Sequence, residues 1–310
     1  MGKAIREVYG EALAKYGKDD ERIVALDADL SGSTKSAIFG KACPERFLNV
    51  GIAESNMVGM AAGLASVGKI PFVNTFTVFL TTLGLCAARA FGSYSQLPIK
   101  FAGAYGGMSD AFDGPSHHAL EDIAVMRSLA NMQVFVPCDA VQTEWLVKYA
   151  IDTPKPIYLR LSRDKFKDLY TSETEFAPGK GIVVREGTDI TVIACGLMVG
   201  NAIDAAEELA KEGISVRVID MFTWKPIDED LIVKSAKETG AIVTAENHNC
   251  TCGLGSAVAR VLSAKCPTPV EMVGVHDQFG QVGAQSFLQE AYKLTAEEIV
   301  ANVKKVIARK

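Results

Sequence analysis

The fold is read most directly from one stretch, Asn49-Val-Gly-Ile-Ala-Glu54-Ser-Asn-Met-Val-Gly-Met-Ala-Ala-Gly63-Leu-Ala65. A short strand leads into a tight turn, and Glu54 begins a helix that we expect to extend to Ser66. The helix is rich in glycine and alanine, whose small side chains allow close packing on a sheet. A glutamate in this position is favoured by the helix dipole. An isolated one would be interpreted as an N-terminal cap.

Short apolar runs alternate with longer amphipathic stretches on both sides of this segment. We expect strands at residues 23–26, 70–74, 99–102, 134–136 and 157–161, and helices at 4–17, 54–66, 81–94, 120–129 and 141–151. Strands that alternate with helices in this way predict a parallel sheet with helices on both faces.

The polar stretch at residues 166–181, with Pro178 and Gly179, predicts an interdomain linker. Alternation then resumes, with strands expected at 190–194, 216–219, 241–245 and 269–273 and helices at 200–211, 229–238, 256–264 and from Thr295 onward. We therefore predict an α/β fold with a first domain at residues 1–165 and a smaller second domain at 182–310.

The composition excludes several classes of function. The net charge of −5 argues against non-specific binding to nucleic acid or to anionic membranes. The apolar runs are interrupted well before the ~20 residues that a membrane span needs. The first residues contain neither a secretory h-region nor the serine or threonine that N-myristoylation prefers. We therefore expect a cytoplasmic protein that binds neither nucleic acid nor membrane.

Seven cysteines, an odd number, lie mostly in apolar surroundings, which favours reduced thiols over a disulfide framework. Cys250 and Cys252 beside His248 could suggest a zinc site. The usual zinc spacing leaves two or more residues between cysteines, however, and no second pair follows. We favour structural thiols in a loop and predict no metal site on this chain.

In order and spacing, residues 49–65 resemble the glutamate helix of the transketolase family of thiamine-diphosphate enzymes. The resemblance implies that Glu54 hydrogen-bonds the aminopyrimidine of the cofactor and promotes the imino tautomer that deprotonates the thiazolium carbon. It also implies a pyrimidine-binding thiamine-diphosphate domain at residues 1–165 and a transketolase C-terminal-like α/β domain at residues 182–310.

The segment Asn74-Thr-Phe76-Thr-Val-Phe79 resembles the pocket that packs the aminopyrimidine ring in transketolases. The resemblance gives that role to Phe76 and Phe79. Two aromatic residues three positions apart are equally typical of a helix that faces the core. The family often has a third aromatic residue where this chain has Thr82.

The segment GGMSDAFDGPSHHALED, residues 106–122, is a glycine-rich polar loop before a helix, where functional residues tend to lie. It resembles the transketolase loop whose aspartate binds a sugar hydroxyl and whose histidine contacts the donor, and the matching positions are Asp113 and His117. A plain turn followed by a helix cap would fit the same residues. His118 lies outside the matched position and is interpreted as structural, and Tyr105 stands where the family often has another histidine.

Four further positions match. Asp29 and Ser33, in Asp27-Ala-Asp29-Leu-Ser-Gly-Ser33, match residues near the cofactor and the substrate phosphate, although an Asx-turn after a strand is an equal alternative. Arg6 and Arg163 match two arginines that bind phosphate. Their planar guanidinium groups suit bidentate bonds to phosphate oxygens, whereas a single arginine is more often a solvated surface residue.

Three later segments, residues 220–226, 246–256 and 275–280, resemble the C-terminal domain of the same family, to which the resemblance assigns assembly and not chemistry. Gly253-Leu-Gly255 at a helix start is a weak phosphate-loop signal. We interpret all three segments as structural.

The chain lacks the Gly-Asp-Gly motif through which family members hold Mg²⁺ or Ca²⁺ and the diphosphate. Because these ions need oxygen ligands that nothing here replaces, we expect a separate N-terminal transketolase subunit to carry that motif and the metal. Thiamine diphosphate would then bind between the two polypeptides. We also expect this chain to form a homodimer within a heterotetramer.

The leading hypothesis is a transketolase subunit of the pentose phosphate pathway that is active only with its partner and transfers a two-carbon ketol unit between phosphorylated sugars. One alternative is the beta subunit of a 2-oxo-acid dehydrogenase, which typically lacks the Asp-Gly-Pro-Ser-His loop. Deoxyxylulose-phosphate synthase has a similar loop but is normally a longer single chain. A non-catalytic scaffold subunit is disfavoured because Glu54, Asp113 and His117 occur together.

Overall fold

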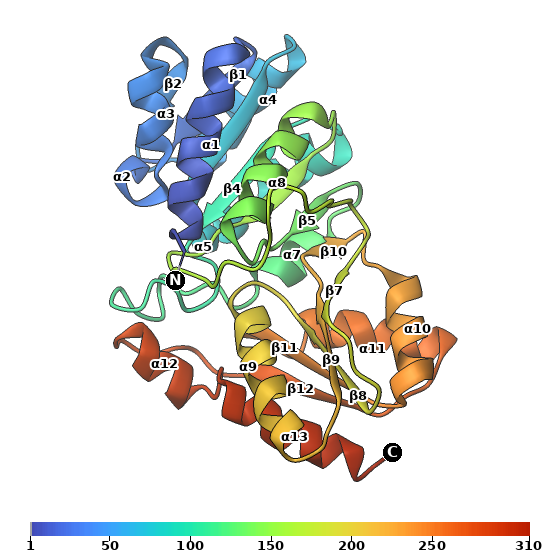
Figure 1. The fold of residues 1–310 in the computed structure, drawn as a ribbon. Coiled ribbons are helices and arrows are strands. Elements are labelled where there is room, and N and C mark those ends of the chain that lie inside the picture. Colours follow the sequence, from blue (N-terminus) through green and yellow to red (C-terminus); the bar gives the residue numbers. More distant parts are fainter. Residues whose placement is uncertain (1) are drawn as a thin grey trace.

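The computed structural model describes residues 2–310 and contains two β-sheets, each covered by helices (Figure 1). The larger sheet has seven strands in the order β10-β5-β6-β4-β3-β1-β2, and the smaller has five in the order β12-β11-β8-β9-β7. The predicted α/β class, with parallel sheets flanked by helices, is confirmed.

The larger sheet is parallel except at one edge, where β10 pairs antiparallel with β5. Its strands are β1 (Ile23–Asp27), β2 (Phe47–Asn49), β3 (Ile70–Phe76), β4 (Lys100–Ala104), β5 (Gln133–Phe135), β6 (Ile157–Arg160) and β10 (Thr223–Lys225). The four central strands, β1, β3, β4 and β6, are buried along their whole length, as parallel strands covered on both faces should be.

The helices of this half are α1 (Ile5–Asp19), α2 (Ser31–Thr34), α3 (Ser36–Ala42), α4 (Glu54–Ser66), α5 (Thr77–Thr82), α6 (Leu85–Ala87), α7 (Asp122–Ser128) and α8 (Ala140–Asp152), with a 3₁₀ turn η1 (Pro44–Arg46) and a π-helix η2 (Ala88–Tyr94). The helix predicted from Glu54 is confirmed with its bounds. The helix predicted over residues 81–94 is confirmed in its later part, but it is not one continuous helix: α5 begins earlier, at Thr77, and ends at Thr82, and the chain continues as α6 and the π-helix.

The smaller sheet is built by the second half of the chain. Its strands are β7 (Ile182–Arg185), β8 (Ile190–Ala194), β9 (Val216–Asp220), β11 (Ile242–Asn249) and β12 (Val270–Val275), and its helices are α9 (Leu197–Lys211), α10 (Glu229–Thr239), α11 (Leu254–Lys265), α12 (Gln285–Ala291) and α13 (Ala296–Ile307). Thr295 caps α13, because its side chain accepts from the amide of Glu298.

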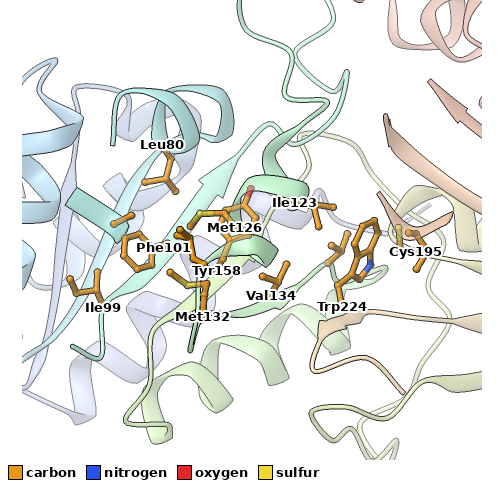
Figure 2. Close-up of a cluster of buried hydrophobic side chains, with 14 of the residues drawn as sticks. Leu80, Ile99, Phe101, Ile123, Met126, Met132, Val134, Tyr158, Cys195 and Trp224 are labelled. Carbon is orange, nitrogen blue, oxygen red and sulfur yellow. The ribbon is translucent and has the colours of Figure 1, made fainter. Parts of the chain in front are cut away.

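One large apolar cluster of the core spans both halves of the chain. Figure 2 shows the cluster running from Leu80 and Phe101 in the first half to Trp224 and Cys195 in the second, and all four side chains are buried. β10 also comes from the second half and extends the larger sheet. Because apolar burial is the main stabilising term in folding, we expect the two halves to unfold together.

Among residues 2–310, no helix has the length and apolar character needed to cross a bilayer.

Candidate active site

The predicted site residues gather at one edge of the larger sheet. Strands β1, β3, β4 and β6 are parallel, so their carboxyl ends meet there. The chain continues from these ends into the segments that carry Asp29, Phe79, Tyr105 and Arg163. The start of α1 joins the same edge, because the amide of Arg6 donates to the carbonyl of Ser162 at 3.2 Å.

Glu54 is buried at the first turn of α4, with 3% of its surface exposed. Its Oε1 accepts from Thr75 Oγ1 on β3 at 3.3 Å. Within residues 2–310 no backbone amide donates to this carboxyl, and the helix start has no side-chain cap. The capping interpretation of Glu54 therefore has no hydrogen bond to support it.

Phe76, Phe79 and His117 come together as one aromatic cluster. The rings of Phe76 and Phe79 stack with centroids 6.0 Å apart and planes inclined by 19°. His117 meets both edge-on, at 5.2 Å from Phe79 and 6.0 Å from Phe76. Thr82 is exposed, and its hydroxyl donates to the carbonyl of Val78 within its own helix at 2.7 Å.

Tyr105, which stands where the family often has a histidine, lies between the aromatic and cationic residues. Its ring centroid is 4.4 Å from that of Phe76. The guanidinium of Arg6 lies 4.9 Å from the same ring and that of Arg163 lies 5.7 Å from it. Because a cation within about 6 Å of an aromatic face is attracted to it, Tyr105 holds the two arginines together.

Arg6 also connects to the predicted phosphate serine. Its Nη1 donates to the backbone carbonyl of Ser33 at 2.8 Å and makes a short hydrogen bond to the hydroxyl of Tyr105. The contact uses the Ser33 carbonyl and leaves its side chain outside the bond. Arg6 and Arg163 therefore lie at one ring, that of Tyr105, and Ser33 is linked to this group through Arg6.

Asp113 and His117 lie in the loop formed by residues 106–119. The amide of His117 donates to Gly114 at 3.0 Å, and Ser116 Oγ lies 2.9 Å from His117 Nδ1, which fixes the imidazole. Asp113 is exposed at the tip of the loop.

The same loop carries a second acid, Asp110, which was not predicted from the sequence as a site residue. It is 1% exposed, its Oδ1 lies 3.8 Å from Arg163 Nη1, and its Oδ2 is buried without a hydrogen bond from residues 2–310. Burial and then the neighbouring Asp113 carboxyl raise the pKa of Asp110 to about 7. The signal in the sequence that could have identified Asp110 is the presence of a second acidic residue close to Asp113 in a glycine-rich loop.

Asp29 lies at the turn that leads to Glu54. It has a left-handed backbone, with φ of 64°, and its Oδ1 accepts from Asn49 Nδ2 at 2.9 Å. The Asx-turn that was the alternative for Asp29 is made instead by Asp27, whose buried carboxyl accepts from the amide of Leu30 at 2.6 Å and the hydroxyl of Thr34 at 2.7 Å. Burial raises the pKa of Asp27.

In the part of the chain that the structure describes, no three His, Cys, Asp or Glu side chains lie close enough to hold a metal. His248, which stands next to the cysteine pair in sequence, is buried and bonds the carbonyl of Asn249 through Nδ1 at 3.0 Å. Burial lowers its pKa to about 4.

Comparison with known families gives two matches that together span most of the chain. Residues 1–168 match the transketolase pyrimidine-binding domain, and residues 179–299 match the transketolase C-terminal domain.

Several curated proteins are similar. The 6-deoxy-6-sulfo-D-fructose transketolase subunit SqwH of Clostridium sp. (strain MSTE9) is 41% identical over 99% of this chain and 95% of its own length. An apulose-4-phosphate transketolase subunit of Phocaeicola vulgatus is 40% identical over 89% of this chain and 88% of its own. Transketolase-like protein 2 of Mus musculus is 42% identical, but the match covers only 49% of that longer protein.

Solved structures agree. A split gene transketolase, described as an inactive beta4 tetramer, matches with a TM-score of 0.90, 48% identity and 99% coverage of both chains. Transketolase from Campylobacter jejuni has the same fold, with a TM-score of 0.82 over 97% of this chain and 46% of its own, at 22% identity.

Proposed function

This chain belongs to the transketolase family, and we propose that it is the part of a split transketolase that binds the aminopyrimidine end of the cofactor and the sugar substrates. The chain spans nearly the full length of subunit-type relatives and about half of single-chain ones. These proportions support a division of the active site between two polypeptides.

Family membership implies dependence on thiamine diphosphate. The residues present fit that cofactor, since a buried carboxyl without a capping bond lies at the same sheet edge as a cluster of three rings. Thiamine diphosphate supplies the carbanion chemistry of ketol transfer when it is bound. In our proposal Glu54 holds a proton against the aminopyrimidine, Phe76 and Phe79 pack its ring, and Asp29 lies nearby.

The sugar site in this proposal consists of Asp113 and His117, with Arg6, Ser33 and Arg163 at the phosphate end. His117 is anchored through Nδ1, so that its Nε2 can exchange a proton with a sugar hydroxyl or carbonyl, as a general acid or base does. The two arginines flank one tyrosine ring and supply planar donors for a terminal anion. We propose that this anion is a phosphate and that the reaction is the two-carbon transfer of the pentose phosphate pathway.

The observation that carries the proposal is the contact of His117 with Phe76 and Phe79. The residues proposed for the sugar and those proposed for the cofactor ring come from separate segments and form one cluster. A ketol transferase needs this adjacency, because the sugar must reach the cofactor.

We propose that the partner polypeptide supplies the Gly-Asp-Gly motif, Mg²⁺ or Ca²⁺ and most of the diphosphate site. Two strongly exposed apolar side chains lie on this half of the chain: Ile52 is 83% exposed in the turn just before Glu54, and Tyr94 is 84% exposed at the end of the π-helix that packs on α4. Large exposed apolar patches mark interaction surfaces. A homodimer of this chain within a heterotetramer is part of the same proposal.

Neither enzymatic alternative gains support from the relatives named above, which are transketolases or their subunits. A reconstitution experiment distinguishes a non-catalytic scaffold subunit from the catalytic subunit that we propose. The purified chain with thiamine diphosphate and Mg²⁺ should show no ketol transfer from D-fructose 6-phosphate. Adding a polypeptide that carries Gly-Asp-Gly, encoded beside this chain, should restore it. Activity of the chain alone would refute the split site, and a stable but inactive complex would favour the scaffold.

A further inference from the structure

We propose that the C-terminal half of the chain positions residues 106–119, here called the sugar-binding loop, and that Asn247 on β11 is the main positioning residue. The identity of the loop as a sugar site rests on the function proposed above. The contacts that hold it are independent of that assignment. They give the C-terminal half a part in catalysis beyond the assembly role expected from its sequence.

The sugar-binding loop is closed at its base. Gly107 and Ala119 form an isolated antiparallel bridge, with Gly107 N donating to Ala119 O at 3.0 Å and Ala119 N donating to Gly107 O at 2.9 Å. The loop is therefore a closed unit whose position depends on what holds the base and the tip.

Asn247 holds the side of the base that is formed by Gly107 and Met108. It is 8% exposed, and its Oδ1 accepts from the amide of Met108 at 3.2 Å. The backbone of Gly107 packs against the same amide group, since a Cβ there would lie 2.5 Å from Asn247 Cγ. Gly107 also has φ of 69°, which glycine adopts without strain.

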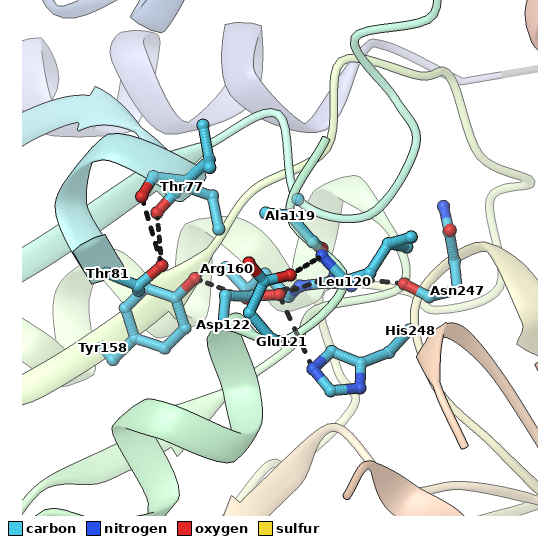
Figure 3. Close-up of polar contacts among 12 residues, drawn as sticks. Thr77, Thr81, Ala119, Leu120, Glu121, Asp122, Tyr158, Arg160, Asn247 and His248 are labelled. Atoms are coloured by element: carbon cyan, nitrogen blue, oxygen red, sulfur yellow. Dashed lines mark hydrogen bonds and ion pairs between the residues drawn. The ribbon is translucent and has the colours of Figure 1, made fainter. Parts of the chain in front are cut away.

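A buried ionic network links the Ala119 side of the base to β11 (Figure 3). Arg160 Nη2 donates to Ala119 O and to Asn247 O, both at 3.0 Å. Asp122 accepts from Arg160 Nε at 2.8 Å and from Tyr158 at 2.6 Å. Because removing one member of a buried pair leaves an uncompensated charge, this network fixes Asn247 relative to the loop.

The tip of the loop is held by residues 280–283, the segment before α12. Gly283 N donates to Ala111 O at 3.2 Å, and a Cβ on Gly114 would lie 2.6 Å from Val282 Cγ2. Gly280 lies directly against the ring of His118. In Figure 1 the loop lies between the N-terminus and α12.

Asp113 and His117 are thus carried by a loop that contacts the C-terminal half directly at Met108 and at its tip. At Ala119 the loop is linked to the same half through Arg160 of β6. The C-terminal half can set the position of both side chains through the loop, without touching the side chains themselves. Displacing reacting groups by about 1 Å can cost about a hundredfold in rate, so loss of these contacts should weaken sugar handling while leaving Glu54 and the cofactor ring site in place.

The test compares three variants in the reconstituted complex. Asn247→Ala removes the acceptor for Met108, Asn247→Asp keeps an acceptor oxygen at the same place, and Asn201→Ala is the matched control. Asn201 donates to Leu294 O at 2.9 Å, a tertiary bond in the same half that does not involve the loop. The measurements are amide hydrogen exchange of the peptide at residues 106–119, KM and kcat with D-fructose 6-phosphate, and C2-proton exchange of the bound cofactor.

We expect Asn247→Ala to speed amide exchange of the loop and to raise the donor KM, each about tenfold, as the loss of one buried hydrogen bond predicts. Cofactor proton exchange should stay within about twofold, since the residue lies outside the cofactor ring site. Asn247→Asp should bring both the amide exchange of the loop and the donor KM most of the way back to wild-type values. Asn201→Ala should change neither quantity. Unchanged loop exchange in Asn247→Ala would refute the contact, and faster exchange with an unchanged KM would refute the positioning role.

A second variant covers the case in which Asn247→Ala does not fold. Gly280→Ala adds a methyl group against His118 and should displace the loop from the opposite side, with the same rise in donor KM and the same constant cofactor exchange. Gly280→Ala with a wild-type KM would overturn the role of the tip contact. If the wild-type complex transfers no ketol unit, the proposed function fails, while hydrogen exchange of the loop still decides whether Asn247 holds it.

Discussion

His117 stands edge-on to Phe79, with ring centroids 5.2 Å apart and planes inclined by 76°. His117 belongs to the loop at residues 106–119 and Phe79 to α5, so folding alone creates the contact. The positive edge of one ring meets the negative face of the other in this arrangement, which favours a fixed orientation. The imidazole is also held through Nδ1 by Ser116.

This orientation predicts the effect of His117→Ala. Proton transfer by a positioned side chain contributes roughly 10²–10⁴-fold to rate, so kcat/KM for a ketose phosphate should fall by about that factor. Affinity for thiamine diphosphate, measured by titration of the complex, should change by less than about threefold, because Phe76 and Phe79 remain stacked. The exposed His276 provides the control substitution. A large loss of cofactor affinity with normal turnover would show that His117 is misassigned.

Glu54→Gln tests the cofactor side of the site. The amide keeps an acceptor for Thr75 and the shape of the side chain but cannot hold the proton that a carboxyl holds. We expect C2-proton exchange of the cofactor in the complex, followed by NMR after acid quench, to slow by roughly 10²-fold or more. Glu45→Gln, on the exposed 3₁₀ turn, should exchange at the wild-type rate. Exchange near the wild-type rate in Glu54→Gln would remove this residue from the mechanism.

The sequence predicts local features of the site well. The helix from Glu54 to Ser66 is confirmed because its start, its apolar spacing and its small residues all lie within one element. The break after Thr82 was missed because the apolar spacing that predicts a helix continues through a region where the chain changes to a π-helix.

Residues that meet only through tertiary structure were harder to predict. Tyr105 and Asp110 gain their roles from Arg6 and Arg163, which come from other segments. Sequence spacing fixes neighbours within a helix or strand, whereas it leaves open which loops meet at a sheet edge. The contact of Asn247 with Met108 was missed for the same reason.

Arg163→Ala should separate recognition of the substrate anion from chemistry. A charge-assisted hydrogen bond contributes about 1.5–3 kcal/mol, so KM for D-fructose 6-phosphate should rise by about 10- to 100-fold. KM for L-erythrulose, a ketose without an anionic group, should change by less than about twofold, since no such bond is lost. Arg185→Ala on β7 serves as the control for removal of a positive charge. An equal rise in KM for both donors would refute a phosphate role for Arg163.

The raised pKa of Asp110 predicts that the difference in stability between wild type and Asp110→Asn depends on pH. Its pKa in the folded chain, about 7, lies above the ordinary carboxyl value of 3.8, so the folded state binds the proton more tightly. Stability from this group is therefore lost as pH rises from about 4 to about 7 and stays constant above that range. Asp110→Asn, which cannot ionise, should match wild type near pH 4 and be more stable at pH 8 by on the order of 2 kcal/mol. Urea unfolding of the isolated chain at both pH values measures the difference, with the exposed Asp168→Asn as control. A difference that is the same at pH 4 and pH 8 would mean that Asp110 is ionised throughout, held as a carboxylate by Arg163.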